Sequence, residues 1–121
     1  MTPENVAVVF HVSELEAAVK YYQDILGFKE AFRYGQTAGV EYGPVIIHLS
    51  GPGIGVNKRM VGQGHIYIFC DEVDEYFQDI FRKGALLIIG PDDRGYGMRD
   101  FAIRDPDGNI LAFGKGNEKT R

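Results

Sequence analysis

The sequence has no tryptophan, a single cysteine, and no apolar run long enough to cross a membrane. Because Cys70 has no second cysteine to pair with, an internal disulfide is excluded, and a reducing compartment fits best. The first residues contain no basic segment followed by an apolar run, and a bilayer-spanning helix needs about 20 apolar residues. We therefore expect a cytoplasmic protein that makes no membrane contact.

Basic side chains are also few. Thirteen Lys and Arg stand against 17 Asp and Glu, which gives a formal charge of -4. No stretch gathers Lys or Arg into the kind of stripe that binds phosphate backbones. Nucleic acid is therefore not an expected partner.

The sequence does contain a series of short apolar segments that repeats once. β-Branched residues at 6–12 predict a strand, and the capping-box spacing of Ser13 and Glu16 predicts that a helix starts there. Apolar residues then recur at three- and four-residue steps until Gly27, which can supply a left-handed stop. Three strand-like segments follow, at 28–34, 38–42 and 45–49.

The second half repeats this order. It predicts a strand at 65–70, a helix at about 73–83 that stops at Gly84, and strands near 86–89, 98–104 and 110–115. The pattern predicts an α+β fold of two βαβββ modules. Its length suits one domain over 1–121, with module one at about 5–50, a glycine-rich connector at 51–64 and module two at 65–116.

The segment 105–109, Asp-Pro-Asp-Gly-Asn, predicts a tight hairpin between the last two strands, since proline presets one backbone angle and glycine permits a positive one. Strict alternation along the strands predicts which side chains face the helices. They are Val6, Val8, Phe10, Val45, Ile47, Leu49, Ile66, Ile68, Phe101, Ile103, Leu111 and Phe113.

Three motifs follow one another along the chain: His11–Leu15 with Ile25–Phe28, then Gly64–Ile66, and finally Phe101–Asn109. Together they resemble the glyoxalase/bleomycin resistance protein/dioxygenase superfamily, also called the vicinal oxygen chelate superfamily. Their order spans nearly the whole chain. The resemblance implies sheets that curl into a half-open barrel with the helices on the convex side, completed by a second subunit in a homodimer.

Metal-dependent members of that superfamily place His, Gln or Glu ligands on the first, fourth, fifth and eighth strands. The motifs align these positions with Ala7, His48, His65 and Ala112. A methyl group has no electron pair to donate, so only His48 and His65 remain as possible ligands. We therefore expect no metal cofactor.

The resemblance is closest in type to metal-free, bleomycin-resistance-like members, which sequester a small molecule such as an antibiotic. On this hypothesis an antibiotic or a metabolite binds in a dimer cleft, through aromatic and polar side chains. The candidate contacts are Tyr42, His48, His65, Tyr67, Phe69, Tyr96 and Asp100.

Other readings stay open. One is a divalent-metal-dependent lyase, isomerase or dioxygenase, and another is a metal-free acid/base enzyme in which Asp100 orients His48 or His65. A third is that the mixed aromatic surface only forms a dimer interface. No catalytic residue is assigned from the sequence.

Overall fold

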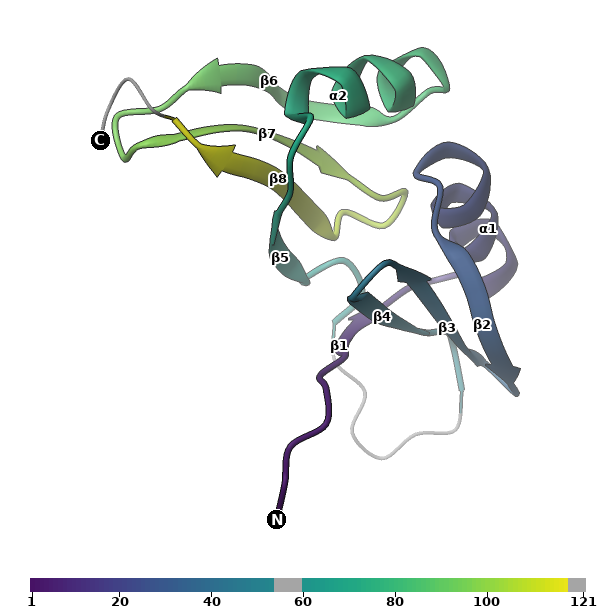
Figure 1. The fold of residues 1–121 in the computed structure, drawn as a ribbon. Coiled ribbons are helices and arrows are strands. Elements are labelled where there is room, and N and C mark those ends of the chain that lie inside the picture. The colour runs from purple at the N-terminus through teal and green to yellow at the C-terminus, as the bar shows by residue number, and fades with distance from the viewer. Residues whose placement is uncertain (54–59, 118–121) are drawn as a thin grey trace.

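The computed structural model describes residues 1–53 and 60–117. Within them the modules have the predicted order of elements, and each is built on a mixed sheet that stays unclosed (Figure 1). The first module contains β1 Val8–His11, α1 Leu15–Lys20, the π-helical turn η1 Tyr21–Ile25, β2 Lys29–Tyr34, β3 Thr37–Tyr42 and β4 Val45–Ser50. The second contains β5 His65–Phe69, α2 Val73–Arg82, β6 Leu86–Asp93, β7 Met98–Arg104 and β8 Ile110–Gly116.

The two sheets have the same topology. Sheet 1 has the order β1-β4-β3-β2, and sheet 2 has the order β5-β8-β7-β6. In each sheet the first strand pairs in parallel with the last, and the other pairs are antiparallel. The α+β class and the two βαβββ modules are therefore confirmed. Part of the predicted connector, residues 54–59, lies outside the described residues.

The first helix begins one residue later than the capping-box prediction. Glu14 is the residue before the helix, and its Oε2 accepts a hydrogen bond from the Ala17 amide at 2.7 Å. The Ser13 amide instead donates to Asp107 Oδ2 at 3.1 Å, because the hairpin of the second module lies against this end of the helix. The predicted stop is correct, since Gly27 has a φ of 84°.

Two strand boundaries also differ from the prediction. Val6 is 80% exposed and lies outside β1, because the ladder between β1 and β4 begins at Val8 and Ile47, so its assignment to the core was wrong. The strand predicted at 86–89 is longer and runs to Asp93 as β6. It contains Pro91, which an edge strand tolerates because its outer amides need no partner.

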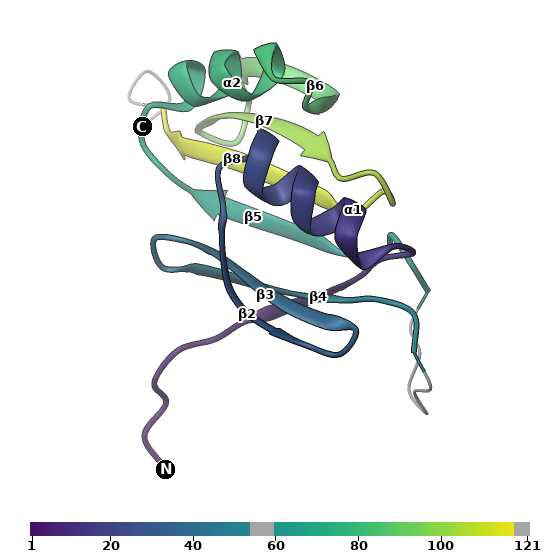
Figure 2. The ribbon, with the colours of Figure 1, turned by 90° about the vertical axis from the view of Figure 1, so that its right-hand side faces the viewer.

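One hydrophobic core serves both modules. It contains Phe10, Ile47 and Leu49 from sheet 1, Phe101 and Leu111 from sheet 2, and residues of both helices. The side chains predicted to face the helices are mostly confirmed, with Val8, Val45 and Ile66 only partly buried. Figure 2 shows α2 lying over sheet 2, and α1 contacts β3 and β4 of sheet 1.

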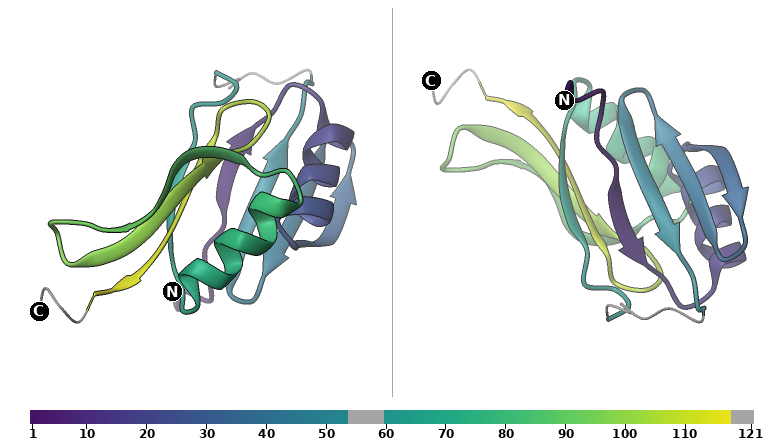
Figure 3. Two further views of the ribbon diagram at one scale, coloured as in Figure 1. Left: turned by 90° about the horizontal axis from the view of Figure 1, so that it is seen from above. Right: turned by 90° about the horizontal axis from the view of Figure 1, so that it is seen from below.

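Each sheet therefore has a face turned towards the helices and the shared core, and an opposite face that we call its outer face. The sheets lie side by side, with β1 and β5 at the join (Figure 3). The join is held by backbone contacts, since the Gly62 amide donates to the His11 carbonyl at 3.1 Å. Any site on the outer faces is thus separated from the core by a sheet.

Among residues 1–53 and 60–117, no helix has the length and apolar character required to span a bilayer.

Candidate functional site

The outer face of sheet 2 carries a cluster of aromatic side chains around one carboxylate. Tyr67 Oη donates to Asp100 Oδ2 at 2.7 Å, and Tyr96 Oη donates to the same oxygen at 2.6 Å. The Phe69 ring lies 5.2 Å from the Tyr67 ring, because side chains two residues apart on a strand share a face. We call Tyr67, Phe69, Tyr96 and Asp100 the aromatic cluster.

The charge of Asp100 is compensated inside the protein. Its side chain is almost fully buried, and Oδ1 accepts a hydrogen bond from Arg94 Nε at 2.9 Å. Arg94 is fixed in turn by bonds from Nη2 to the Gly90 and Asp100 carbonyls at 2.7 and 2.9 Å. Asp100 therefore acts as an anchor that orients two phenols, and it offers no free charge to a ligand.

The same contacts decide the protonation states. Burial on its own would raise the pKa of Asp100, but hydrogen bonds from Tyr96, Arg94 and Tyr67 outweigh it, and the pKa lies below the ordinary aspartate value. Burial and the bond to Asp100 raise the pKa of Tyr67, and the bond to Asp100 raises that of Tyr96. At neutral pH both phenols are therefore protonated donors to an ionised carboxylate.

A glycine makes this arrangement possible. The Tyr67 side chain lies against Gly114 of β8, where an added Cβ would be 2.1 Å from Tyr67 Oη and 2.9 Å from Asp100 Cβ. Only a residue without a side chain leaves room for the phenol to cross β8 and reach β7. The sequence alone does not predict a role for Arg94 or Gly114, since neither belongs to a recognisable motif.

Asp100→Asn will destabilise the protein by about 2 kcal/mol at pH 7, because one ionic acceptor of three hydrogen bonds is lost. Since the folded-state pKa of Asp100 is depressed, its contribution is complete above the unfolded-state pKa of about 3.9 and is lost as pH falls through the folded-state value. Urea unfolding at several pH values measures this. The gap between the two proteins should be constant from pH 5 to 7 and shrink below about pH 4. A gap that persists at pH 2 would contradict this role.

The histidines lie elsewhere. His48 is on the outer face of sheet 1, opposite Val9 and Gly39, and the Phe32 ring packs edge-on against it at 5.1 Å. His65 is exposed at the start of β5, opposite Ile110 on sheet 2. The described hydrogen bonds of the Asp100 carboxylate come from Tyr67, Tyr96 and Arg94, and none of them joins it to His48 or His65.

The residues present do not fit a four-position metal site. Ala112 lies opposite Tyr67 on one side and Ala102 on the other, so a methyl group stands where metal-dependent members have a donor. Ala7 precedes β1 and is equally without a donor. Across the described residues, no three His, Cys, Asp or Glu side chains are grouped so that they could hold a metal ion.

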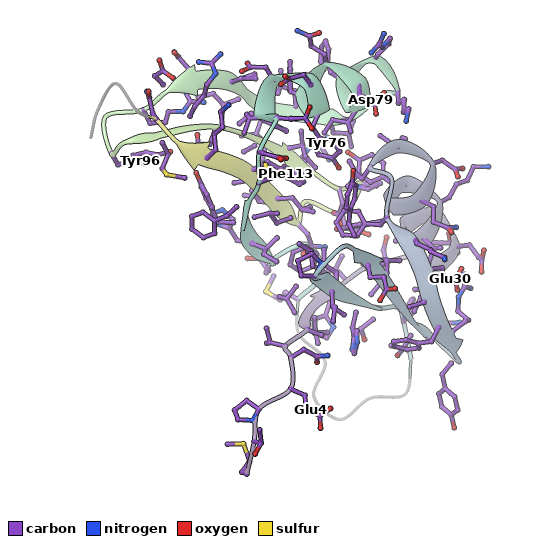
Figure 4. The ribbon with its side chains drawn as sticks, in the orientation of Figure 1. Glu4, Glu30, Tyr76, Asp79, Tyr96 and Phe113 are labelled. Carbon is purple, nitrogen blue, oxygen red and sulfur yellow. The ribbon has the colours of Figure 1, made fainter. Side chains whose placement is uncertain are left out.

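Tyr42 is separated from the other candidate contacts. Its ring packs edge-on against Phe28 at 5.5 Å and Tyr76 at 5.9 Å, on the helix side of the sheets. The side chains in Figure 4 make the separation visible, with Tyr76 and Phe113 between α2 and sheet 2 and Tyr96 at the far end of that sheet. The structure thus brings together Tyr67, Phe69, Tyr96 and Asp100 out of the seven candidates.

A family model described as the glyoxalase/bleomycin resistance protein/dioxygenase superfamily matches residues 6–113. The chain belongs to this superfamily. The match takes in both modules and the closing hairpin, so superfamily membership is confirmed. No match is found among curated proteins.

Solved structures share the fold at low sequence identity. TioX from Micromonospora sp. ML1 has a TM-score of 0.81 at 20% identity, over 94% of this chain and 99% of that one. A virulence protein from Salmonella typhimurium has a TM-score of 0.77 at 21% identity, over 96% and 99% of the two chains. A lactoylglutathione lyase from Agrobacterium tumefaciens has a TM-score of 0.76 at 24% identity, over 95% and 96%. At these identities the likeness shows the fold alone.

Proposed function

We propose that this superfamily member is a metal-independent protein that binds an aromatic small molecule, such as an antibiotic or a metabolite, at the aromatic cluster. The observation that carries the proposal is that Asp100 anchors the two phenols of the cluster. A carboxylate buried between two phenols and an arginine fixes Tyr67 and Tyr96 in place and leaves their rings available. Tyr96 is 67% exposed and Phe69 is 77% exposed.

The chemistry of the cluster favours a planar aromatic ligand. Rings held rigidly at a surface stack against another ring with little loss of conformational entropy. The compensated charge of Asp100 means that the ligand needs no positive charge to bind there. Because each phenol donates its only hydrogen to Asp100, the two phenol oxygens would orient such a ligand as acceptors, with His48 or His65 as further polar contacts.

A second copy of the chain would complete the site. The outer faces carry apolar side chains that a lone chain leaves in contact with water, and exposed apolar surface of this kind marks a binding or subunit surface. These side chains are Val9, Phe32, Phe69 and Ile89. On this proposal the cytoplasmic protein is a homodimer, and its ligand lies in the cleft between the outer face of one copy and its partner.

The donor set supports binding without a metal. A catalytic zinc-type site needs about three protein ligands and an open position, and Ala7 and Ala112 remove two of the four family positions. Two imidazoles on different sheets are a poor substitute. On this proposal the ligand binds without a metal ion.

The proposal is tested with 2-naphthol, a neutral fluorescent aromatic, titrated in the presence of a chelator. The lack of tryptophan leaves the naphthol emission clear of protein fluorescence. Saturable binding is expected, and a Phe69→Ala, Tyr96→Ala double variant should weaken it about tenfold, since each lost ring contact is worth about 0.5–1.5 kcal/mol.

The matched control is Tyr34→Ala, which removes an exposed ring from β2. It should leave the affinity for 2-naphthol within a factor of two of the parent value. Equal weakening by Tyr34→Ala, or no weakening by the double variant, would contradict the assignment of the site.

A further inference from the structure

A separate cavity of about 460 Å³ opens where the two modules meet on the helix side. Its floor and walls come from both modules, and its rim comes from the segment that joins β5 to α2 and from α2 itself. We call it the acidic groove, and its principal lining residues are Phe28, Tyr42, Tyr76, Phe113, Asp71, Glu72, Glu75 and Asp79. A cavity of this size is in the range that holds a small organic molecule.

The walls of the acidic groove form a continuous series of aromatic rings. Phe28 contacts Tyr42 at 5.5 Å, Tyr42 contacts Tyr76 at 5.9 Å, and Tyr76 contacts Phe113 at 5.0 Å. Tyr76 is fixed by a bond from its hydroxyl to the Leu26 carbonyl at 2.6 Å. Aromatic faces of this kind attract organic cations through the negative charge density above the ring.

The rim adds negative charge that ion pairs of the protein compensate only in part. No lysine, arginine or histidine is among the lining residues. Asp79 pairs with Lys83 at 3.2 Å, whereas among the described ion pairs none involves Asp71, Glu72 or Glu75. This is the reverse of the aromatic cluster, where Arg94 neutralises the carboxylate.

An inorganic ion fits the groove poorly. In the part of the chain that the structure describes, no three acidic side chains are grouped as metal ligands. The volume is also far larger than a bare ion requires. The occupant that matches both walls and rim has a single positive charge and an apolar body.

We propose that the acidic groove is a second binding site, for a small organic cation whose ammonium group lies near Asp71, Glu72 and Glu75 and whose apolar body contacts the four rings. The site lies on the helix side, so it is distinct from the aromatic cluster on the outer face of sheet 2. Among the residues of the cluster, Phe69 alone also borders the groove. Because the walls come from both modules, the cation would bridge them.

The test is a titration of ¹⁵N-labelled protein with benzyltrimethylammonium, compared with neutral 2-phenylethanol. Saturable chemical-shift changes are expected at Tyr42, Glu72, Glu75 and Tyr76, with at least tenfold weaker binding of the neutral compound. A D71N/E72Q/E75Q variant should bind the cation at least tenfold more weakly. The charge-matched control is E4Q/D24N/E41Q, which neutralises three exposed acids outside the groove and should change the affinity less than twofold.

Two further variants keep the result decisive if the triple variant does not fold. Glu75→Gln and Tyr42→Ala change exposed side chains of the rim and wall, and each should weaken the cation about threefold or more without affecting 2-naphthol. Conversely, Tyr96→Ala should leave cation binding unchanged, which distinguishes the acidic groove from the aromatic cluster. Any of three results would overturn the proposal. The acid variants could bind the cation with wild-type affinity, or the shift changes could be confined to Tyr67, Tyr96 and Asp100. Binding could also fail to saturate at a cation concentration of about 10 mM.

Discussion

Asp105→Ala will lower the free energy of unfolding by about 3–5 kcal/mol, the largest effect expected of any single substitution outside the apolar core. Asp105 is fully buried and directly follows β7. Its Oδ1 accepts from the amides of Asp107 and Asn109 at 2.9 and 3.0 Å, and its Oδ2 accepts from Tyr22 Oη at 3.0 Å and Asn109 Nδ2 at 2.9 Å. Removing the carboxylate leaves several buried donors without an acceptor.

This carboxylate also joins the modules. Tyr22 belongs to η1 of the first module, and Asn109 Nδ2 also donates to the His11 carbonyl at 3.2 Å. Urea unfolding measures the loss, and Tyr22→Phe should account for about 1 kcal/mol of it. The matched control is Asp107→Ala in the same hairpin, which removes only one exposed contact to the Ser13 amide and should cost less than about 1 kcal/mol. If Asp105→Ala costs no more than Asp107→Ala, Asp105 does not hold the modules together.

Gly62→Ala is the second large effect, and we expect a loss of about 2–4 kcal/mol. Gly62 has a φ of 78°, and a Cβ on it would be 1.9 Å from the Asp107 carbonyl oxygen and 2.9 Å from its carbonyl carbon. Both contacts are with backbone atoms, so the loop and the closing hairpin would have to move apart. The bond from the Gly62 amide to the His11 carbonyl would be strained by the same movement.

Gly35→Ala separates the clash from the backbone strain. Gly35 has a comparable φ of 56°, but a Cβ there would meet no atom within 4 Å. Its cost should therefore be about 1 kcal/mol, from the left-handed backbone alone. Thermal and urea unfolding of both variants should show Gly62→Ala as clearly the less stable. Equal stability of the two would mean that the loop and hairpin can separate freely.

The sequence was sufficient for the fold because its local signals agreed with each other. The stop at Gly27, the hairpin at 105–109 and the alternation of Ile47 and Leu49 all depend on residues close in the chain. Where a distant residue competes, the local signal failed. Glu14 caps the helix in place of Ser13, and the Ser13 amide donates to Asp107, 94 residues away, instead of to Glu16.

The candidate site could be predicted only in part for the same reason. Alternation along β5 and β7 was enough to place Tyr67 and Asp100 on one face, but the partner Arg94 directly follows β6, a strand in which bulges break the alternation. Tyr42 shares a face of β3 with Ala38 and Val40, which are both buried on the helix side. The pattern therefore already indicated that Tyr42 lies apart from Tyr67. The role of Gly114 depends on the ring of another strand, which no local pattern records.

The most direct test of a metal-independent protein is the melting temperature of chelator-stripped protein with and without nickel, zinc, manganese or ferrous ion, alongside a His48→Ala, His65→Ala double variant. We expect that no metal raises the melting temperature of the parent protein by more than it raises that of the double variant. A metal present at about 100 times its dissociation constant would add about 2.7 kcal/mol to the stability of a protein with a real site. A rise of that order for one metal, lost in the double variant, would contradict metal independence and favour a lyase, isomerase or dioxygenase.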